Sequence, residues 1–334
     1  MAWMGFGGEQ LLTPNETVEP ARPPRPTIGL ALGGGAARGF AHIGVIRVLQ
    51  RAGYGIDVVA GASIGAVVGG CYLAGKLDEL ESWARSLTKR RVLGLLDLSL
   101  GGGGLIAGSR LAHLLAHDLG GVQIEDLPVP FAAVATEIGP GHEIWLTRGS
   151  LVKAIRASYA LPGIFEPVKI GGRWLMDGAL VNPVPVSTAR ALGARMVIAV
   201  NLNGELTGRG AVVPSHGSND DEELPPVEQQ LRTTAIGAAS ALIKRQLGFA
   251  PKRVLPRGPR TPGISTVIVD AFNITQDRIS RSRLAGDPPD AMVNPRLGRV
   301  GLFDFHRAEE IIELGAEAAL KALDTIRDTA EALA

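Results

Sequence analysis

The amino-acid sequence predicts a three-layer α/β/α fold, in which helices cover both faces of a central, mostly parallel β-sheet. Strand-like and helix-like patterns alternate from residue 27 to residue 203, as expected where helical crossovers connect parallel strands. Several of the strand-like runs are short and apolar, which is typical of strands buried on both faces. The 44 glycines and the aromatic content of 4% also favour close packing of small residues between layers.

The first elements are predicted in the order strand, glycine-rich turn, helix, strand, helix. The run TIGLAL at residues 27–32 predicts a buried strand, and residues 40–53 predict a helix after the glycines. A second strand is expected at residues 57–63. Small residues over 64–76 predict a buried helix, and residues 76–90 predict a more polar, amphipathic one.

The later elements continue the alternation. Residues 92–108 are apolar but contain four successive glycines, which favours a flexible apolar loop. From there to residue 203 we expect, in order, a helix at 109–120, strands at 131–138 and 142–149, a helix at 150–163, a strand and turn at 173–186, and a helix and strand at 187–203. Beyond residue 203 we expect a helix at 227–247, a strand at 265–272 and a long amphipathic helix at 303–333.

These elements divide the chain into four parts. Residues 1–26 end in repeated prolines and are predicted to be a mobile leader. Residues 27–203 form the α/β core. The polar, turn-rich residues 204–228 are expected to be a solvated loop, and residues 229–334 a mainly helical extension packed on the core.

Composition limits the class of partner and the compartment. The 34 basic and 33 acidic side chains leave a net charge of +1, so no overall field attracts nucleic acid, and we expect no nucleic-acid partner. The single cysteine, Cys71, excludes an intramolecular disulfide and a thiolate zinc site. The first residues lack the pattern of a secretory signal, so we expect a cytoplasmic protein. The amphipathic residues 230–249 and 304–333 leave peripheral contact with the inner face of the membrane open.

An uncharged run, VVAGASIGAVVGGCYLAG at residues 58–75, contains a G-x-S-x-G pattern around Ser63. The run is barely long enough to cross a bilayer, and its place between a strand-like and a helix-like pattern predicts a buried strand, a turn and a buried helix instead. Gly61 and Gly65 flank the serine and allow backbone to pass close to it. Such a strand-to-helix turn exposes the serine oxygen and is typical of a nucleophile elbow.

A second glycine-rich turn, LGGGAARGFAHIGV, precedes the first helix, where unpaired backbone amides converge on an anion. The anion is either a cofactor phosphate or the oxyanion of an attacked ester. The dinucleotide pattern G-x-G-x-x-G is not met, because a count from Gly33 ends at Arg38 and a count from Gly34 places Ala36 third. Arg38, which precedes Gly39, either fixes this loop or is an ordinary surface arginine.

A third motif, LMDGALVNPVPV, places Asp177 before Gly178 at the end of an apolar strand. This pair is compatible with an ordinary Asp-Gly turn and with a general base. A carboxylate of ordinary pKa is a weak base, so the second interpretation requires partial burial of Asp177.

The histidines offer one further candidate. His113 and His117 lie four residues apart without a third ligand, so we expect no metal site, and His42 lies just inside the first helix. His306 follows Ser63 and Asp177 in the order Ser, Asp, His of the α/β-hydrolases, which keeps a catalytic triad open.

Together, the three motifs resemble the patatin-like phospholipases, in their order and their separations. The resemblance covers residues 27–203 well and continues more loosely toward the C-terminus. It implies hydrolysis of fatty acyl esters of lipids by a dyad of Ser63 as nucleophile and Asp177 as base, with no cofactor or metal. It further implies an oxyanion hole formed by the amides of Gly34, Gly35 and Ala36, although many relatives have a fourth glycine at position 36.

The same resemblance assigns supporting roles in the motifs to Gly33, Arg38, Gly39, Gly61, Gly65 and Gly178. Residues 92–108 are then a candidate mobile lip for an apolar substrate. Three alternatives stay open: an esterase with a Ser63, Asp177 and His306 triad, a non-catalytic adaptor with this fold, and a nucleotide-binding module.

Overall fold

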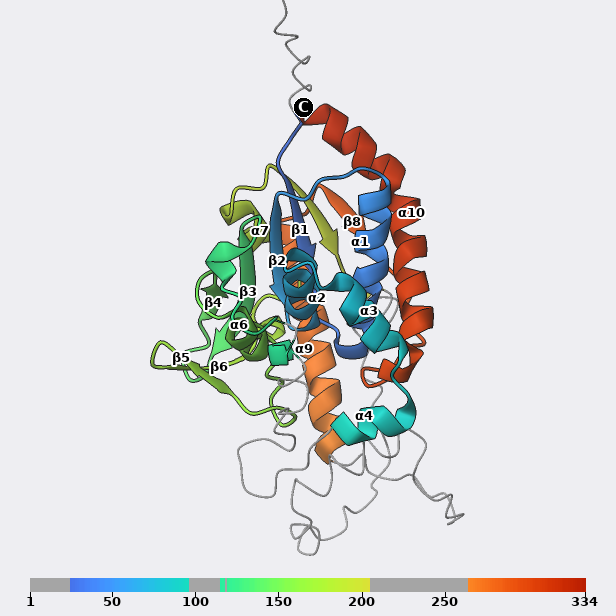
Figure 1. Cartoon of the computed structure of the whole chain (residues 1–334). Coiled ribbons are helices and arrows are strands. Elements are labelled where there is room, and N and C mark those ends of the chain that lie inside the picture. Colours follow the sequence, from blue (N-terminus) through green and yellow to red (C-terminus); the bar gives the residue numbers. More distant parts are fainter. Residues whose placement is uncertain (1–24, 96–114, 118, 205–263) are drawn as a thin grey trace, which may run out of the picture.

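The computed structural model describes residues 25–95, 115–117, 119–204 and 264–334, and it confirms the predicted three-layer α/β/α fold (Figure 1). The strands are β1 Ile28–Leu32, β2 Val58–Ala62, β3 Phe131–Glu137, β4 Glu143–Leu146, β5 Val168–Ile170, β6 Arg173–Asp177, β7 Met196–Val200 and β8 Ala291–Val293. They form one sheet in the order β5-β6-β3-β2-β1-β7-β8, with β4 also paired to β3. The run from β3 to β8 is parallel, and β4, β5 and β6 are antiparallel to their neighbours.

Helices connect and cover these strands. The α-helices are α1 Ala41–Arg51, α2 Ile64–Leu73, α3 Leu77–Arg85, α4 Lys89–Leu95, α6 Leu151–Ser158, α7 Val186–Ala191, α9 Ile264–Gly286 and α10 Ala308–Ala332. The short 3-10 helices are η1 Ala36–Phe40, η2 Ile124–Asp126, η3 Gly178–Leu180 and η6 Phe305–Arg307. The uncharged run at residues 58–75 divides as predicted into β2, a turn at Ser63 and α2.

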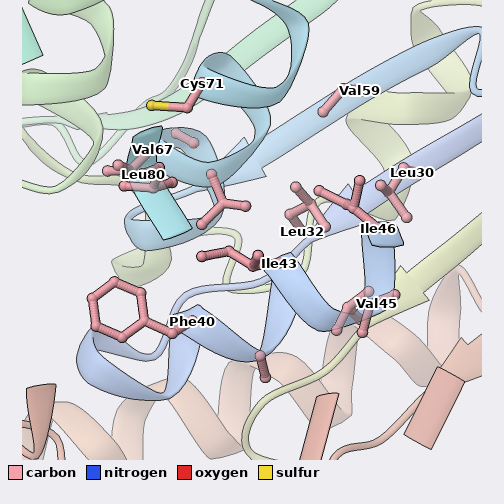
Figure 2. Packing of buried hydrophobic residues seen from close by; sticks show 14 of the residues in the cluster. Leu30, Leu32, Phe40, Ile43, Val45, Ile46, Val59, Val67, Cys71 and Leu80 are labelled. Carbon is pink, nitrogen blue, oxygen red and sulfur yellow. The ribbon is translucent and has the colours of Figure 1, made fainter. Parts of the chain in front are cut away.

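The two faces of the sheet are packed by different helices. On one face, Leu30 and Leu32 of β1 belong to a large apolar cluster with Ile43 and Ile46 of α1 (Figure 2). On the other face, Ala31 of β1 belongs to a cluster of smaller side chains that includes residues of β2, β7 and α7. Successive residues of β1 therefore face opposite layers, and small side chains predominate in the second layer.

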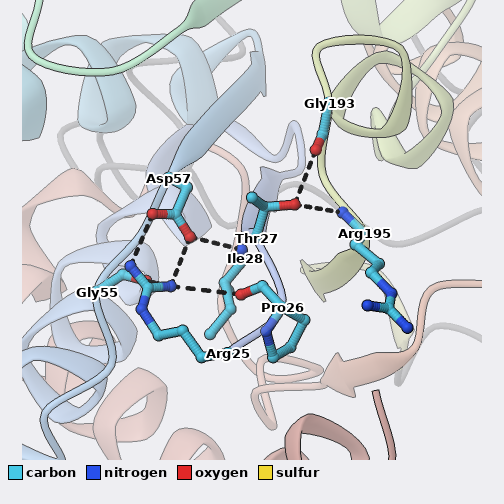
Figure 3. Close-up of polar contacts among 8 residues, drawn as sticks. All are labelled: Arg25, Pro26, Thr27, Ile28, Gly55, Asp57, Gly193 and Arg195. Carbon is cyan, nitrogen blue, oxygen red and sulfur yellow. Dashed lines mark hydrogen bonds and ion pairs between the residues drawn. The ribbon is translucent and has the colours of Figure 1, made fainter. Parts of the chain in front are cut away.

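Polar contacts hold the amino end of β1 between its two neighbours (Figure 3). Asp57 accepts hydrogen bonds from the Ile28 amide at 2.7 Å and from the Arg25 guanidinium at 2.6 and 2.8 Å. Thr27 donates its hydroxyl to the Gly193 carbonyl at 2.9 Å and accepts from the Arg195 amide. These contacts fix the start of β1 relative to the segments that lead into β2 and β7.

The C-terminal third of the chain contributes to the core. β8 pairs in parallel with β7, and α10 lies along α1 (Figure 1). The two helices approach so closely that a Cβ atom on Gly44 would overlap the Ile312 carbonyl, and one on Gly315 would overlap the Ala41 carbonyl. Glycines at these two positions therefore let the helix backbones touch.

One predicted element is wrong: residues 265–272 lie in α9 and not in a strand. The run is rich in β-branched residues, which favour strands. Tertiary packing overrides this preference, because the partly buried Phe272 and the buried Gln276 and Ser280 are spaced four residues apart and lie on one helical face toward the core. The short strands β5 and β8 were not predicted, since three residues carry almost no periodic signal.

Several predictions lie wholly or mostly outside the described residues. They are the leader at 1–26, the apolar loop at 92–108, the helix at 109–120, the polar loop at 204–228 and the helix at 227–247. The first four residues of the predicted apolar loop, 92–95, are helical and belong to α4. Among the helices that are described, none has the length and apolar character needed to cross a membrane.

The close contact between α1 and α10 leaves no room for a side chain at Gly315. We expect Gly315→Ala to lower the free energy of unfolding by about 2 kcal/mol, because the added methyl group overpacks the helix crossing. Gly286→Ala is the matched control, since a Cβ atom there meets no atom within 4 Å. Urea unfolding of both variants checks this expectation, and equal midpoints would contradict the close crossing.

Candidate active site

Ser63 lies at the sharp turn between β2 and α2. Its backbone has φ 55° and ψ −124°, a conformation that costs a residue with a side chain about 1–3 kcal/mol. A Cβ atom on Gly61 would lie 2.5 Å from the Ala66 amide nitrogen, and one on Gly65 would overlap the Leu32 carbonyl oxygen. Both glycines of the G-x-S-x-G pattern are therefore sterically required for this turn.

The sheet brings Asp177 to Ser63. Ala62 pairs with Val134 of β3, and the next residue of β3, Ala135, pairs with Asp177 at the end of β6. The Ser63 hydroxyl donates a hydrogen bond of 2.7 Å to Asp177 Oδ2, although the two residues are 114 positions apart. The structure thus places two residues of the predicted site in direct contact.

The Asp177 carboxyl group is buried, with 1% of the residue exposed. Burial raises its pKa from 3.8 to about 7, and the hydrogen bonds from Ser63 and from the Ala179 amide at 2.8 Å oppose this rise in part. The Thr136 hydroxyl and the Ala160 carbonyl bind the backbone of Asp177. The carboxyl group is therefore held rigidly in a setting that makes it a stronger base.

The glycine-rich turn after β1 lies next to Ser63. Its backbone amides differ in whether they already donate a hydrogen bond within the protein. The Gly34 amide donates to the Pro183 carbonyl at 2.9 Å, so the expectation that Gly34 is an oxyanion donor is not supported by this structure. Over the described parts of the chain, the Gly35 and Ala36 amides have no hydrogen-bond partner, and both residues line the same cavity as Ser63. Ala36 has φ 48°, so alanine occupies here a conformation that favours glycine.

The other motif residues support the backbone. The Gly33 amide donates to the Val200 carbonyl, and Gly39 passes close to the side chain of Ile64. Gly178 packs so tightly that a Cβ atom would overlap the Val134 carbonyl.

Arg38 is buried and does not lie on the surface. Its guanidinium donates to the Val300 carbonyl at 2.9 Å and to Asn203 Oδ1 at 3.2 Å. Burial lowers its pKa, and Asp304 opposes this effect. Arg38 therefore joins the glycine-rich turn to the C-terminal part of the chain.

A mainly apolar cavity opens beside the Ser63 hydroxyl. Its polar lining residues besides Ser63 include Asp177, Gln276 and Tyr159, and its far end is bounded by Lys76 and Glu79, which form an ion pair of 2.7 Å. The apolar lining residues include Phe40, Val67, Cys71, Leu80, Trp83, Leu115, Leu119, Leu161, Ile164, Phe165, Phe272, Leu302 and Phe303.

Comparison with known proteins finds relatives that match most of this chain. The sequence model of the patatin-like phospholipases matches residues 30–190. An uncharacterised NTE family protein of Mycobacterium tuberculosis is 36% identical over 335 residues, which cover 90% of this chain and 92% of the relative. The chain belongs to the patatin-like phospholipase family.

Two other relatives are much longer than this chain. Neuropathy target esterase sws of Drosophila melanogaster is 34% identical over 59% of this chain and 13% of its own length. Lysophospholipase NTE1 of Pyricularia oryzae is 29% identical over 90% of this chain and 19% of its own length. The chain therefore corresponds to a small part of these two proteins.

Two residues of this patatin-like chain support the site without having been predicted to do so. The Ser158 hydroxyl accepts from the Ser63 amide at 2.9 Å and donates to the Val134 carbonyl at 2.6 Å, so it holds the turn to β3. His42 contacts the Gly33 carbonyl through Nε2 at 2.8 Å. Burial lowers the His42 pKa to about 4, so the ring is neutral and donates this hydrogen bond.

The structure does not bring His306 into hydrogen-bond contact with Ser63 or Asp177. His306 lies in η6, which packs against α3 and α4, while Ser63 and Asp177 contact each other directly. The other Asp177 oxygen accepts from the Ala179 amide, so both oxygens already have a hydrogen-bond partner without His306. In the described ranges, no group of three or more His, Cys, Asp or Glu residues is arranged to hold a metal ion, and His113 lies outside those ranges.

The raised pKa of Asp177 predicts a pH-dependent cost in stability. The unfolded carboxyl group ionises near pH 3.8 and the folded one near 7, so stability falls as pH rises through this interval and stays lower above it. The interval spans about three pH units, which corresponds to about 4 kcal/mol.

Asp177→Asn retains the shape of the side chain; its oxygen accepts from the Ala179 amide and its NH₂ group donates to Ser63 Oγ, as the protonated carboxyl group does. We therefore expect this variant to be more stable than the wild type by up to about 4 kcal/mol at about pH 8 and about equally stable at about pH 4. Urea unfolding at the two pH values checks this expectation. A stability difference that is the same at both would contradict a buried, proton-binding Asp177.

Proposed function

We propose that this chain is a serine lipid acyl hydrolase that cleaves fatty acyl esters through an acyl-serine intermediate. The observation that carries the proposal is the 2.7 Å hydrogen bond from Ser63 to the buried carboxyl group of Asp177, at the polar end of an apolar cavity. Family membership supports the same reaction class, since two of the longer relatives are named an esterase and a lysophospholipase.

In the first step, Ser63 Oγ forms a bond to the ester carbonyl carbon while its proton moves to Asp177 Oδ2. The carbonyl electron pair moves onto oxygen, where the Gly35 and Ala36 amides stabilise the charge, each donor contributing about 3 kcal/mol. The tetrahedral intermediate then expels the alcohol, which takes the proton from Asp177. An acyl-serine ester is left on Ser63.

In the second step, a water molecule gives its proton to Asp177 and attacks the acyl-serine carbonyl. The same amides stabilise the second oxyanion, and the fatty acid leaves as Ser63 regains its proton. A carboxyl group with a pKa of about 7 is well suited to this exchange, because it accepts and returns a proton near neutral pH.

The cavity supports an apolar acyl group as the substrate portion next to Ser63. Val67 and Cys71 follow Ser63 at intervals of four residues along one side of α2 and line the cavity. At the helical rise, the distance from Ser63 to Cys71 is about 12 Å, so an extended chain lies along α2 toward the ion pair of Lys76 and Glu79.

A fluorophosphonate probe tests the proposed nucleophile. We expect the wild type and His306→Asn to be labelled covalently at similar rates and Ser63→Ala to remain unlabelled, because phosphonylation requires the Ser63 hydroxyl and not an imidazole. Intact-mass spectrometry measures the labelling. A large loss in folded His306→Asn would favour a triad, and an unlabelled wild type would favour a non-catalytic adaptor.

The pH profile tests the proposed base. We expect kcat/KM for a soluble ester of a medium-chain fatty acid to rise with pH to a plateau, with a midpoint of about 7, because only ionised Asp177 accepts the serine proton. Steady-state kinetics over the stable pH range measure the midpoint. A midpoint near 3.8, the ordinary value for this side chain, would contradict a desolvated base.

A further inference from the structure

Gln276 of α9 is a polar side chain in the wall of the cavity, and it lies outside the part of the chain that the family model matches. Phe272, one turn earlier, packs against Ala62, Val134 and Ala179 and so fixes α9 above the ends of β2 and β3. Gln276 is 1% exposed, and it shares the cavity lining with Ser63. Burial of a side-chain amide costs free energy unless its N–H and C=O groups form hydrogen bonds.

The side-chain amide of Gln276 lies close to Ser63. A Cβ atom placed on Gly34 would lie 3.4 Å from Ser63 Cβ and 3.6 Å from Gln276 Nε2. Gly34 therefore lies between the two side chains and, because it has no side chain, leaves the space between them open.

A chain of hydrogen bonds determines which end of the Gln276 amide faces this space. Arg38 has only donors, so the oxygen of Asn203 must face it, as the 3.2 Å contact to Oδ1 requires. Asn203 Nδ2 then faces away from Arg38 and donates to Gln276 Oε1 at 3.5 Å. Gln276 consequently turns its NH₂ group toward Gly34.

Gln276 and the proposed base, Asp177, approach Ser63 from opposite sides. Asp177 lies on the β3 side of Ser63, whereas Asn203 follows β7 on the other side of β1. Gln276, in contact with Asn203, therefore approaches Ser63 from the side of the glycine-rich turn, where the carbonyl oxygen of the ester becomes negatively charged.

We propose that Gln276 Nε2 donates a hydrogen bond to the oxyanion, as a side-chain donor beside the Gly35 and Ala36 amides. The inference rests on the proposed acyl transfer at Ser63. Gln276 neither gains nor loses a proton, and it stabilises the electron pair that moves onto the carbonyl oxygen. Arg38 and Asn203 are positioning residues, because they act by orienting Gln276.

Gln276→Met tests the donor, since methionine has a similar length and no N–H group. We expect kcat to fall by about 100-fold with little change in KM, and the rate of fluorophosphonate labelling to fall in parallel. Ser280→Ala is the matched control, because Ser280 is buried one turn further along α9 and does not line the cavity. We expect Ser280→Ala to retain wild-type kcat.

Asn203→Asp tests the orientation without altering α9. An aspartate at position 203 pairs with Arg38 and cannot donate, so Gln276 must turn its NH₂ group toward the new carboxylate and its oxygen toward the oxyanion. We expect kcat to fall by at least as much as in Gln276→Met. In the Gln276→Met background, the same change at position 203 should have little further effect.

Thermal unfolding of each variant verifies that it is folded. Independent, multiplicative losses in the double variant would contradict the orienting role of Asn203, and equal labelling rates in the wild type and in Gln276→Met would contradict the donor. Both results leave the proposed function standing. A folded wild type that neither labels nor hydrolyses esters would instead overturn the acyl transfer itself, and the role of Gln276 with it.

Discussion

The hydrogen bond between Ser63 and Asp177 joins residues that only the complete sheet brings together. β3 lies between the two strand ends, parallel to β2 and antiparallel to β6, so its register determines the distance between the hydroxyl and the carboxyl group. Burial of that carboxyl group raises its pKa to about 7 and costs stability at neutral pH. The apolar core on both faces of the sheet must offset this cost, which makes the site dependent on the whole fold.

Backbone strain is concentrated at the same place. Among the residues that the structure describes, Ser63 and Ala36 are the non-glycine residues with positive φ, and both line the cavity. Neighbouring contacts hold them there: Ser158 binds the Ser63 amide, and His42 and Pro183 bind the turn before Ala36. Strain of this kind persists only where surrounding structure fixes it, and it holds the Ser63 hydroxyl and the Gly35 and Ala36 amides in fixed positions, as the proposed acyl transfer requires.

The sequence predicted those features that depend on local pattern. The turn at Ser63, the glycine-rich loop and the Asp-Gly pair are contiguous motifs, and the layered fold followed from alternating strand and helix patterns. Contacts over long distances in the chain were not predictable from the sequence. Ser158, Asn203 and Gln276 are ordinary polar residues until folding places Ser158 against Ser63 and Asn203 against Arg38 and Gln276. The engagement of the Gly34 amide by Pro183 and the helical state of residues 265–272 likewise depend on tertiary packing.

The protonation state of Asp177 is the most direct test of this account, because the proposed base, the cost in stability and the geometry of the site all depend on it. Carbon-13 NMR of the side-chain carboxyl groups in aspartate-labelled protein, with Asp177→Asn used to assign the resonance, measures its pKa without a substrate. We expect this carboxyl group to titrate with a midpoint of about 7. A midpoint near the ordinary 3.8 would show that the carboxyl group is solvated and would contradict the proposed dyad with its desolvated base.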